Sequence, residues 1–198
     1  WQQEIEPDWA GLGHAELRVL LLDVPELRLQ EPAKQNLHKL SYYVPLYADT
    51  QALSAAIRQR LEASGVRASL VWSIDEPKDI GLLDVLPARA DKRHAVSFLM
   101  QRNGFSLGET VFAGDSGNDL PVLVSEIPAV LVANASEAVR RDALSQAALL
   151  GNPAALYIAQ GGYLDMNGNY TAGVLEGVVH YIPAAGDWLM QCRAEEHA

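Results

Sequence analysis

Three continuous apolar runs, each flanked by helical stretches, constrain the fold of the second half of this chain most strongly. The runs are TVFAG (110–114), AVLVA (129–133) and ALYIA (155–159). The predicted helices around them are 91–103, 118–126, 136–148 and 171–181. Continuous apolar runs are typical of parallel strands that are buried on both faces. Residues 89–183 therefore predict a doubly wound α/β layer, in which sites form at the carboxyl ends of the strands.

The first half of the chain has a different pattern. Helices are predicted at 15–24 and 50–65, and strands at 37–46, 68–74 and 80–87. The second helix has the clearest signals, with Thr50 as the expected N-cap and Gly65 as the expected C-cap. We expect an α+β unit with helices on one face of an antiparallel sheet. The predicted domains are 1–88 and 89–198.

Charge and composition limit the classes of binding partner. The 198 residues hold 15 Lys and Arg against 25 Asp and Glu, a net charge of −10. This balance argues against nucleic acid or an anionic membrane as the partner, since both attract basic patches. No apolar run approaches the ~20 residues that span a bilayer, and no signal-peptide pattern is seen. The single cysteine, Cys192, excludes an internal disulfide and suits a cytoplasmic protein.

Two carboxylates and a carboxamide lie in one turn after the first apolar run of the second half. They are Asp115, Asn118 and Asp119, in the stretch GDSGND (114–119). Such a turn can simply cap the following helix. However, carboxylates and amides are the hard oxygen ligands that suit Mg²⁺. Their place at the end of a predicted buried strand favours a metal site.

The stretch GDSGND resembles the fourth motif of the haloacid dehalogenase (HAD) superfamily of phosphohydrolases. Lys92, at the start of the preceding predicted helix, matches the lysine that this superfamily places upstream. A narrower resemblance, to the sucrose-phosphate phosphatase subfamily, covers nearly the whole chain in order. It rests on WQQEIEPDW (1–9), QNLHKLSYYV (35–44), GLLDVLP (81–87), GDSGNDLPVL (114–123) and TAGVLEGVVHYIP (171–183).

The resemblance implies a fold and a chemistry. Residues 1–88 would be the α+β cap domain, and residues 89–198 the carboxyl-terminal part of the HAD-like core. The reaction would be Mg²⁺-dependent hydrolysis of a disaccharide phosphate through an aspartyl-phosphate. Asp115 would bind Mg²⁺ directly, while Asn118 and Asp119 would hold its waters and position Lys92. The catalytic residues would then be Lys92, Asp115 and Asp119.

The nucleophile motif of the superfamily, Asp-x-Asp-x-Thr after a strand, is not found in the sequence. Asp8 and Asp23 lack both the preceding strand and the second aspartate. We therefore expect the carboxyl-terminal part of a longer phosphatase, inactive by itself. The alternative is a non-catalytic module of the kind fused to sucrose-phosphate synthases, with a synthase domain as its partner.

The predicted cap holds the candidates for sugar recognition. Lys39 lies in a predicted strand beside His38, and Asp84 is a charged residue inside an apolar strand. Lys78 belongs to the stretch 75–79, which is longer and more charged than expected for the plant and cyanobacterial enzymes. Lys39, Asp84 and Lys78 are thus predicted to bind the substrate, although Asp84 can also be structural. The disaccharide stays open between sucrose 6-phosphate and others, such as mannosylfructose phosphate.

A calcium loop is a weaker possibility in DMNGNYTAGVLE (165–176). Oxygen-bearing residues occupy positions 1, 3, 5 and 12, but Tyr170 stands at position 6, where such a loop needs glycine. We therefore expect a simple connection into the last core helix. His94 and His180 have no second metal-type ligand at suitable spacing and are expected to be ordinary helix residues.

Overall fold

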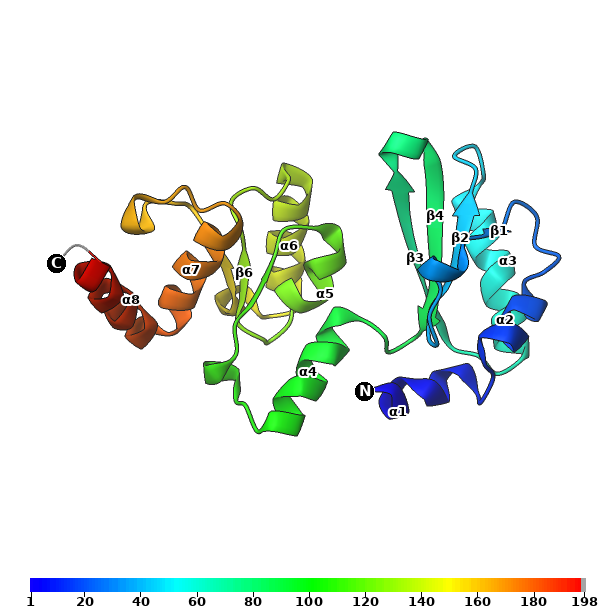
Figure 1. Cartoon of the computed structure of the whole chain (residues 1–198), viewed down its shortest axis with the longest axis horizontal. Helices are drawn as coiled ribbons and strands as arrows, with labels where there is room; N and C mark the ends of the chain where they lie inside the picture. Colours follow the sequence, from blue (N-terminus) through cyan, green and yellow to red (C-terminus); the bar gives the residue numbers. More distant parts are fainter. Residues whose placement is uncertain (197–198) are drawn as a thin grey trace. The chain divides into compact units, whose positions relative to one another are not determined.

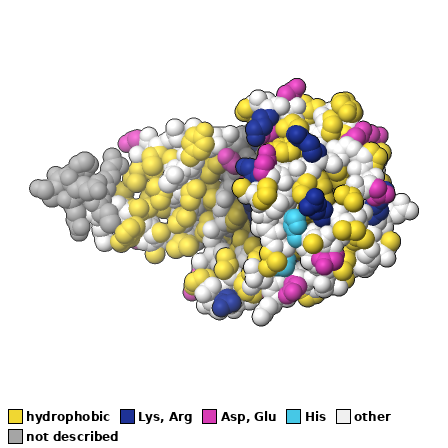
Figure 2. Space-filling model, turned by 45° about the vertical axis from the view of Figure 1, so that its right-hand side comes forward, with side chains coloured by type: hydrophobic (Ala, Val, Ile, Leu, Met, Phe, Trp, Pro, Cys, Tyr) yellow, Lys and Arg dark blue, Asp and Glu magenta, His cyan; other side chains and the backbone are white. Residues whose placement is uncertain are grey.

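The computed structural model describes residues 1–196, with side chains through Gln191, so the side chain of Cys192 lies outside the described part. The chain folds into two compact units, Trp1–Asp91 and Lys92–Ala198. None of the helices in the described part combines the length and hydropathy that a membrane crossing requires. Figure 2 shows acidic and basic side chains interspersed on the face of the molecule that it presents.

The first unit is a four-stranded antiparallel sheet with helices on one side (Figure 1). Its strand order is β1-β2-β4-β3. The strands are β1 (Arg28–Leu29), β2 (Leu40–Val44), β3 (Ala68–Asp75) and β4 (Ile80–Pro87). The helices are α1 (Gln2–Ile5), α2 (His14–Leu20) and α3 (Thr50–Ala63). The predicted α+β architecture is confirmed, with the sheet packed against α2 and α3.

Burial alternates along β4 because successive side chains point to opposite faces of the sheet. Leu83 and Val85 are buried in the same core as Leu17 of α2 and Ile57 of α3. The intervening Asp84 is only partly buried. Asp84 therefore lies on the face of the sheet that α2 and α3 do not cover, which we call the open face.

Several local predictions for this unit were inaccurate. Asp49, not Thr50, is the N-cap of α3, because its carboxylate accepts hydrogen bonds from Gln51 N and Ala52 N, both at 3.0 Å. Ser64, not Gly65, is the C-cap of α3, and Gly65 follows it with a left-handed φ of 73°, which is common just beyond a helix end. Strand β2 begins only at Leu40, so Lys39 precedes the strand.

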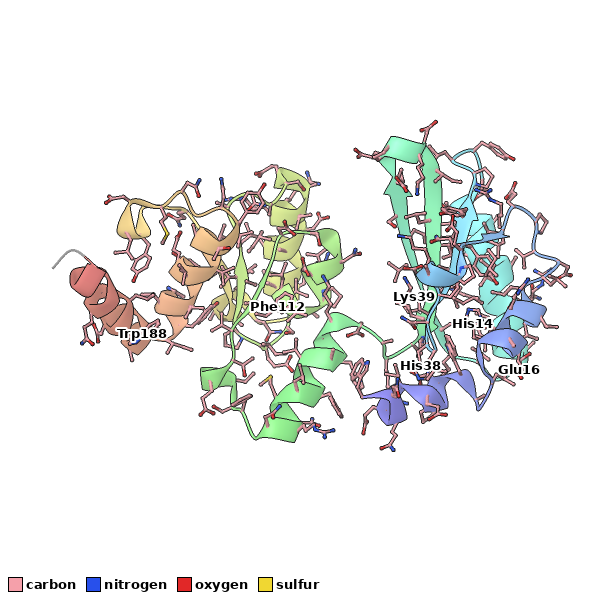
Figure 3. All side chains as sticks on the ribbon, in the orientation of Figure 1. His14, Glu16, His38, Lys39, Phe112 and Trp188 are labelled. Atoms are coloured by element: carbon pink, nitrogen blue, oxygen red, sulfur yellow. The ribbon has the colours of Figure 1, made fainter. Side chains whose placement is uncertain are left out.

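The second unit is a parallel sheet of order β5-β6-β7, as predicted. Its strands are β5 (Phe112–Gly114), β6 (Ala129–Leu131) and β7 (Leu156–Ile158). Its helices are α4 (Lys92–Asn103), α5 (Leu120–Leu123), α6 (Glu137–Leu149), α7 (Tyr170–Tyr181) and α8 (Pro183–Glu196). Helix α8 was not predicted from the sequence. Its Trp188, labelled in Figure 3, is 63% exposed.

Strand β6 is buried on both faces, which explains its uninterrupted apolar sequence. Leu131 packs in one cluster with Ala143 of α6, whereas Val130 packs in another with Val174 of α7. Helix α7 approaches β6 so closely that a Cβ at Gly177 would lie 2.0 Å from a Val130 methyl carbon. Helices on both faces of a parallel sheet define a doubly wound α/β layer.

Candidate active site

The predicted motif forms a turn at the carboxyl end of β5, and Asp119 is its internal anchor. Residues Gly117–Asp119 are a 3₁₀ turn that leads into the short α5, so the regular helix predicted over 118–126 is much reduced. Asp119 Oδ2 accepts hydrogen bonds from Asp115 N at 3.1 Å, Ser116 N at 3.1 Å and Ser116 Oγ at 2.9 Å. These bonds fix the course of the turn.

The other carboxylate oxygen of Asp119 holds the predicted lysine. Lys92 is the first residue of α4, and its ammonium donates to Asp119 Oδ1. Asp119 is 4% exposed. Burial opposes its charge, but the hydrogen bonds from Lys92 and Ser116 outweigh that effect and hold the pKa of Asp119 below its usual value. An ionised Asp119 thus keeps the charge of Lys92 at the carboxyl end of β5.

Asp115 and Asn118, by contrast, have exposed side chains at the surface of the turn. Asp115 Oδ2 accepts a hydrogen bond of 3.3 Å from the amide of Asn134, which lies in the loop after β6. The sequence analysis did not identify Asn134. The available signal was that Asn134 directly follows the apolar run 129–133. This run contains β6, the strand next to β5, and the carboxyl ends of neighbouring parallel strands share one edge of the sheet.

The donor set of this turn fits Mg²⁺. Asp115 offers an exposed carboxylate and Asn118 an exposed amide oxygen, and Mg²⁺ characteristically takes only one or two protein carboxylates together with waters and phosphate oxygens. No cluster of three or more His, Cys, Asp and Glu side chains suited to a metal occurs among the described residues. The turn therefore offers part of a coordination shell.

On the open face of the first unit, Lys39, Ser41 and Asp84 form a polar cluster. Ser41 Oγ donates to Asp84 Oδ1 at 2.5 Å, and Lys39 Nζ lies 3.7 Å from Asp84 Oδ2. Both members of the ion pair are about one third exposed, and Figure 3 shows Lys39 at the entry to β2. The fully buried Ser41 hydroxyl thus supports Asp84 from below, while the charged groups face outward.

Lys78 belongs to a second cluster near the tip of the β3–β4 hairpin. Its ammonium lies 3.1 Å from Asp75 Oδ2, and this hydrogen-bonded pair raises the pKa of Lys78. Nearby, Tyr43 OH donates to Glu31 at 2.8 Å. Tyr43 is two residues along β2 from Ser41, on the same face of the sheet. The structure therefore brings Lys39 and Asp84 together and holds Lys78 in a separate cluster.

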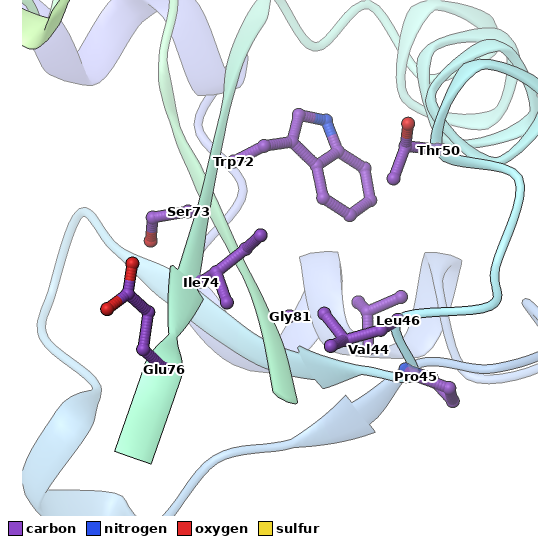
Figure 4. Close-up of a pocket in the computed structure, with 9 residues that line it drawn as sticks. All are labelled: Val44, Pro45, Leu46, Thr50, Trp72, Ser73, Ile74, Glu76 and Gly81. Carbon is purple, nitrogen blue, oxygen red and sulfur yellow. The ribbon is translucent and has the colours of Figure 1, made fainter. Parts of the chain in front are cut away.

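An apolar pocket of about 530 Å³ lies on the other side of this sheet (Figure 4). Trp72 and Ile74 of β3 line it with Thr50 at the start of α3. Trp72 Nε1 donates to Ser54 Oγ of α3 at 3.1 Å, which places Trp72 on the helix-covered face. Since Asp84 is on the opposite face, this pocket is distinct from the Lys39–Asp84 cluster.

Glu176, which occupies position 12 of the calcium-loop pattern, has a structural role instead. Its Oε1 accepts hydrogen bonds from Gln160 N and Tyr157 OH, each at 2.8 Å, and its Oε2 from Gly161 N at 2.9 Å. Burial is the largest influence on Glu176, but these donors hold its pKa below the usual value. Glu176 therefore fixes the loop after β7 from within α7. His180 stacks on Tyr157 at 4.1 Å, as an ordinary packing residue.

The chain is similar in sequence to known proteins. The family of sucrose-6F-phosphate phosphohydrolases matches residues 1–182. A HAD-like protein of Nitrosococcus oceani is 50% identical over 98% of this chain and 52% of its own. Sucrose-phosphatase 1 of Nicotiana tabacum is 33% identical over 57% of this chain and 26% of its own. Mannosylfructose-phosphate phosphatase of Agrobacterium fabrum is 35% identical over 54% of this chain and 41% of its own.

A solved structure has the same fold. The sucrose-phosphatase of Synechocystis, determined with sucrose and phosphate, has a TM-score of 0.66 and 23% identity, covering 91% of this chain and 66% of that one. The parallel α/β layer with its Asp115 turn, joined to an α+β unit, is thus the fold of a HAD-like protein. The chain belongs to the sucrose-6F-phosphate phosphohydrolase family. It spans about half the length, or less, of the curated relatives named above.

Proposed function

We propose that this chain forms the cap and the carboxyl-terminal part of the core in a Mg²⁺-dependent sugar-phosphate phosphatase whose substrate is a disaccharide phosphate. Residues 1–88 act as the cap and residues 89–198 as the core. The observation that supports this most is the exposed Asp115 carboxylate next to the ion pair between Lys92 and the buried Asp119, at the carboxyl end of β5, in a chain of this family.

Each residue of the turn has a separate task in this proposal. Asp115 binds the metal ion directly, and Asn118 holds one of its waters. Lys92 offsets the charge of the phosphoryl group and of the nucleophile. Asp119 keeps Lys92 in place through Oδ1, whose remaining lone pair is available to a metal-bound water. When bound, Mg²⁺ would offset the negative charge shared by phosphate and carboxylates.

The nucleophile in this proposal is an aspartate outside these 198 residues, and the reaction passes through an aspartyl-phosphate. Neither early aspartate suits the role. Asp8 is fully buried, where it accepts hydrogen bonds from Arg67 and Arg89. Asp23 is exposed and pairs with Arg60 at 3.4 Å. It does not follow a strand of the parallel sheet, because all three of these strands come later in the sequence. Strand β5 is at the edge of its sheet, and an edge strand can pair with a further strand, here one that bears the nucleophile.

In this proposal, the open face of the cap sheet binds and recognises the sugar. The Lys39–Asp84 pair presents a donor and an acceptor side by side, which matches the paired hydroxyl groups of a sugar ring. Lys78 offers a second charged group toward the tip of the hairpin. Sucrose 6-phosphate is the first substrate to test, and mannosylfructose phosphate the second, since relatives named for sucrose phosphatase and for mannosylfructose-phosphate phosphatase both match this chain.

The test compares sucrose 6-phosphate, mannosylfructose phosphate and fructose 6-phosphate as substrates of the full-length protein that contains this chain. We expect one disaccharide phosphate to exceed fructose 6-phosphate in kcat/KM by ~10²-fold or more, because contacts to the second sugar help to close the cap. Lys39→Ala should narrow this gap. Arg60→Ala is the control, since Arg60 lies in α3, on the covered side of the sheet, and pairs with Asp23 at 3.4 Å. An equal kcat/KM for all three substrates would mean that the protein is a phosphatase that does not recognise a second sugar.

A further inference from the structure

We propose that Asn134 is a positioning residue that fixes the orientation of the Asp115 carboxylate. This inference rests on the proposed function, because it concerns the oxygen that Asp115 offers to the metal ion. Asn134 lies in the loop after β6 and is partly buried. Its amide bridges two groups that are far apart in the sequence, Asp115 and the first residue of α7.

The two hydrogen bonds of Asn134 define which way its amide points. Asn134 Oδ1 accepts a hydrogen bond of 2.7 Å from Tyr170 N. A backbone N–H can only donate, so the carbonyl oxygen of the amide must face Tyr170. The NH₂ group is then directed toward Asp115 Oδ2, at 3.3 Å. Asn134 therefore presents a donor, never an acceptor, to the Asp115 carboxylate.

The support for Asn134 is itself rigid. Tyr170 is the first residue of α7 and has a left-handed φ of 47°, which is rare for a residue with a side chain. Asn169, the N-cap of α7, makes no side-chain capping bond, so Asn134 takes over that task from another loop. A backbone bond of 2.9 Å from Ala133 N to Gly168 O ties the same two loops together.

The loop that carries Tyr170 is fixed from its other end as well. Glu176 of α7 binds Gln160 N and Gly161 N, as described above. Gly161 and Gly168 approach so closely that a Cβ at Gly168 would lie 2.6 Å from Gly161 N. Strain and tight packing of this kind keep a supporting residue in one position. Asp115 is thereby held through Asn134 by α7, and its Oδ1 is left for the metal ion.

The experiment uses the full-length protein and three variants. Asn134→Ala removes both bonds, whereas Asn134→Asp keeps an acceptor for Tyr170 N and sets a like charge against Asp115. Asn152→Ala is the matched control, because the Asn152 amide donates to Val124 O at 3.1 Å in the same unit, whereas the Asn134 amide donates to Asp115. Each protein is measured for its unfolding temperature, for Mg²⁺ affinity by titration calorimetry, and for kcat at saturating Mg²⁺.

We expect Asn134→Ala to weaken Mg²⁺ binding about tenfold or more, the usual effect of losing a partner of a metal ligand. Asn152→Ala should lower the unfolding temperature without changing Mg²⁺ affinity more than about twofold. Asn134→Asp should unfold close to the wild-type temperature but lose about tenfold or more in kcat.

Two results would overturn the proposal while leaving the proposed function intact. They are an Asn134→Ala protein that binds Mg²⁺ as tightly as Asn152→Ala does, and an Asn134→Asp protein with wild-type kcat. The second would mean that Asn134 serves only to cap α7. A wild-type protein that neither binds Mg²⁺ nor hydrolyses sugar phosphates would overturn the proposed function and this inference together.

Discussion

Asp119 occupies the space where a side chain at Gly114 would stand. A Cβ on Gly114 would lie 2.5 Å from Asp119 Cγ and 2.7 Å from its Oδ2. Real Cβ atoms do not approach other heavy atoms so closely. The buried position of Asp119, and with it the place of Lys92, therefore depends on the absence of a side chain at the end of β5.

Gly114→Ala should push Asp119 out of its place and uncouple Lys92 from the turn. We expect kcat of the full-length protein to fall by about tenfold or more, because the proposed function needs the lysine charge to be held where the phosphoryl group reacts. Gly117→Ala is the control in the same turn, since a Cβ there meets nothing within 4 Å. Comparable activity of the two variants in a phosphatase assay would show that the Gly114–Asp119 approach is unimportant.

Asp115→Ala should abolish Mg²⁺-dependent hydrolysis. In the proposed function, this substitution removes a direct metal ligand and leaves the phosphate and the nucleophile without a shared cation, so we expect a loss of ~10³-fold or more in kcat. The assay is hydrolysis of a sugar phosphate across a range of Mg²⁺ concentrations, with the exposed Asp142 of α6 changed to alanine as the control. Activity within about threefold of wild type would contradict the role of Asp115 as a metal ligand.

Lys92 and Lys78 should differ in which kinetic constant they control. Lys92→Met should reduce kcat even for a small substrate such as p-nitrophenyl phosphate, because in the proposed function its charge acts at the reacting group. Lys78→Met should change mainly KM, and only for particular sugars, because Lys78 lies in the first unit, beside Asp75, and the proposed function gives this unit the sugar-binding role. Equal effects of both substitutions on kcat for p-nitrophenyl phosphate would rule out this division.

Asp119→Asn should destabilise the second unit in a pH-dependent way. The folded-state pKa of Asp119 is lowered relative to the unfolded state, so its contribution is fully present above the unfolded carboxyl pKa of about 4. The contribution is lost as the pH falls through the folded-state pKa. We expect the variant to lose about 2 kcal/mol of unfolding free energy at pH 7 and the difference to shrink at about pH 3. Chemical denaturation at both pH values measures this, and a constant difference would mean that the charge of Asp119 is not involved.

The sequence predicted the parallel layer well because burial on both faces leaves a direct mark. Val130 faces α7 and Leu131 faces the α6 side, so neither residue can be polar, and the strand is uninterrupted. The lengths of strands and helices were predicted less accurately. The helix expected after Asn118 is mostly a 3₁₀ turn and a single short helix, because the bonds to Asp119 shape the chain there more strongly than helix propensity does.

The candidate site, too, could be predicted from the sequence only in part. Spacing in GDSGND and the place of Lys92 were enough to predict that Asp115, Asn118, Asp119 and Lys92 belong together, and the structure gathers them at one strand end. Only the tertiary structure distinguished the buried Asp119 from the exposed Asp115, because that difference depends on which donors surround each carboxylate. Asn134 and Glu176 could not be assigned from sequence, since their partners come from distant loops that meet only when α7 packs against β6.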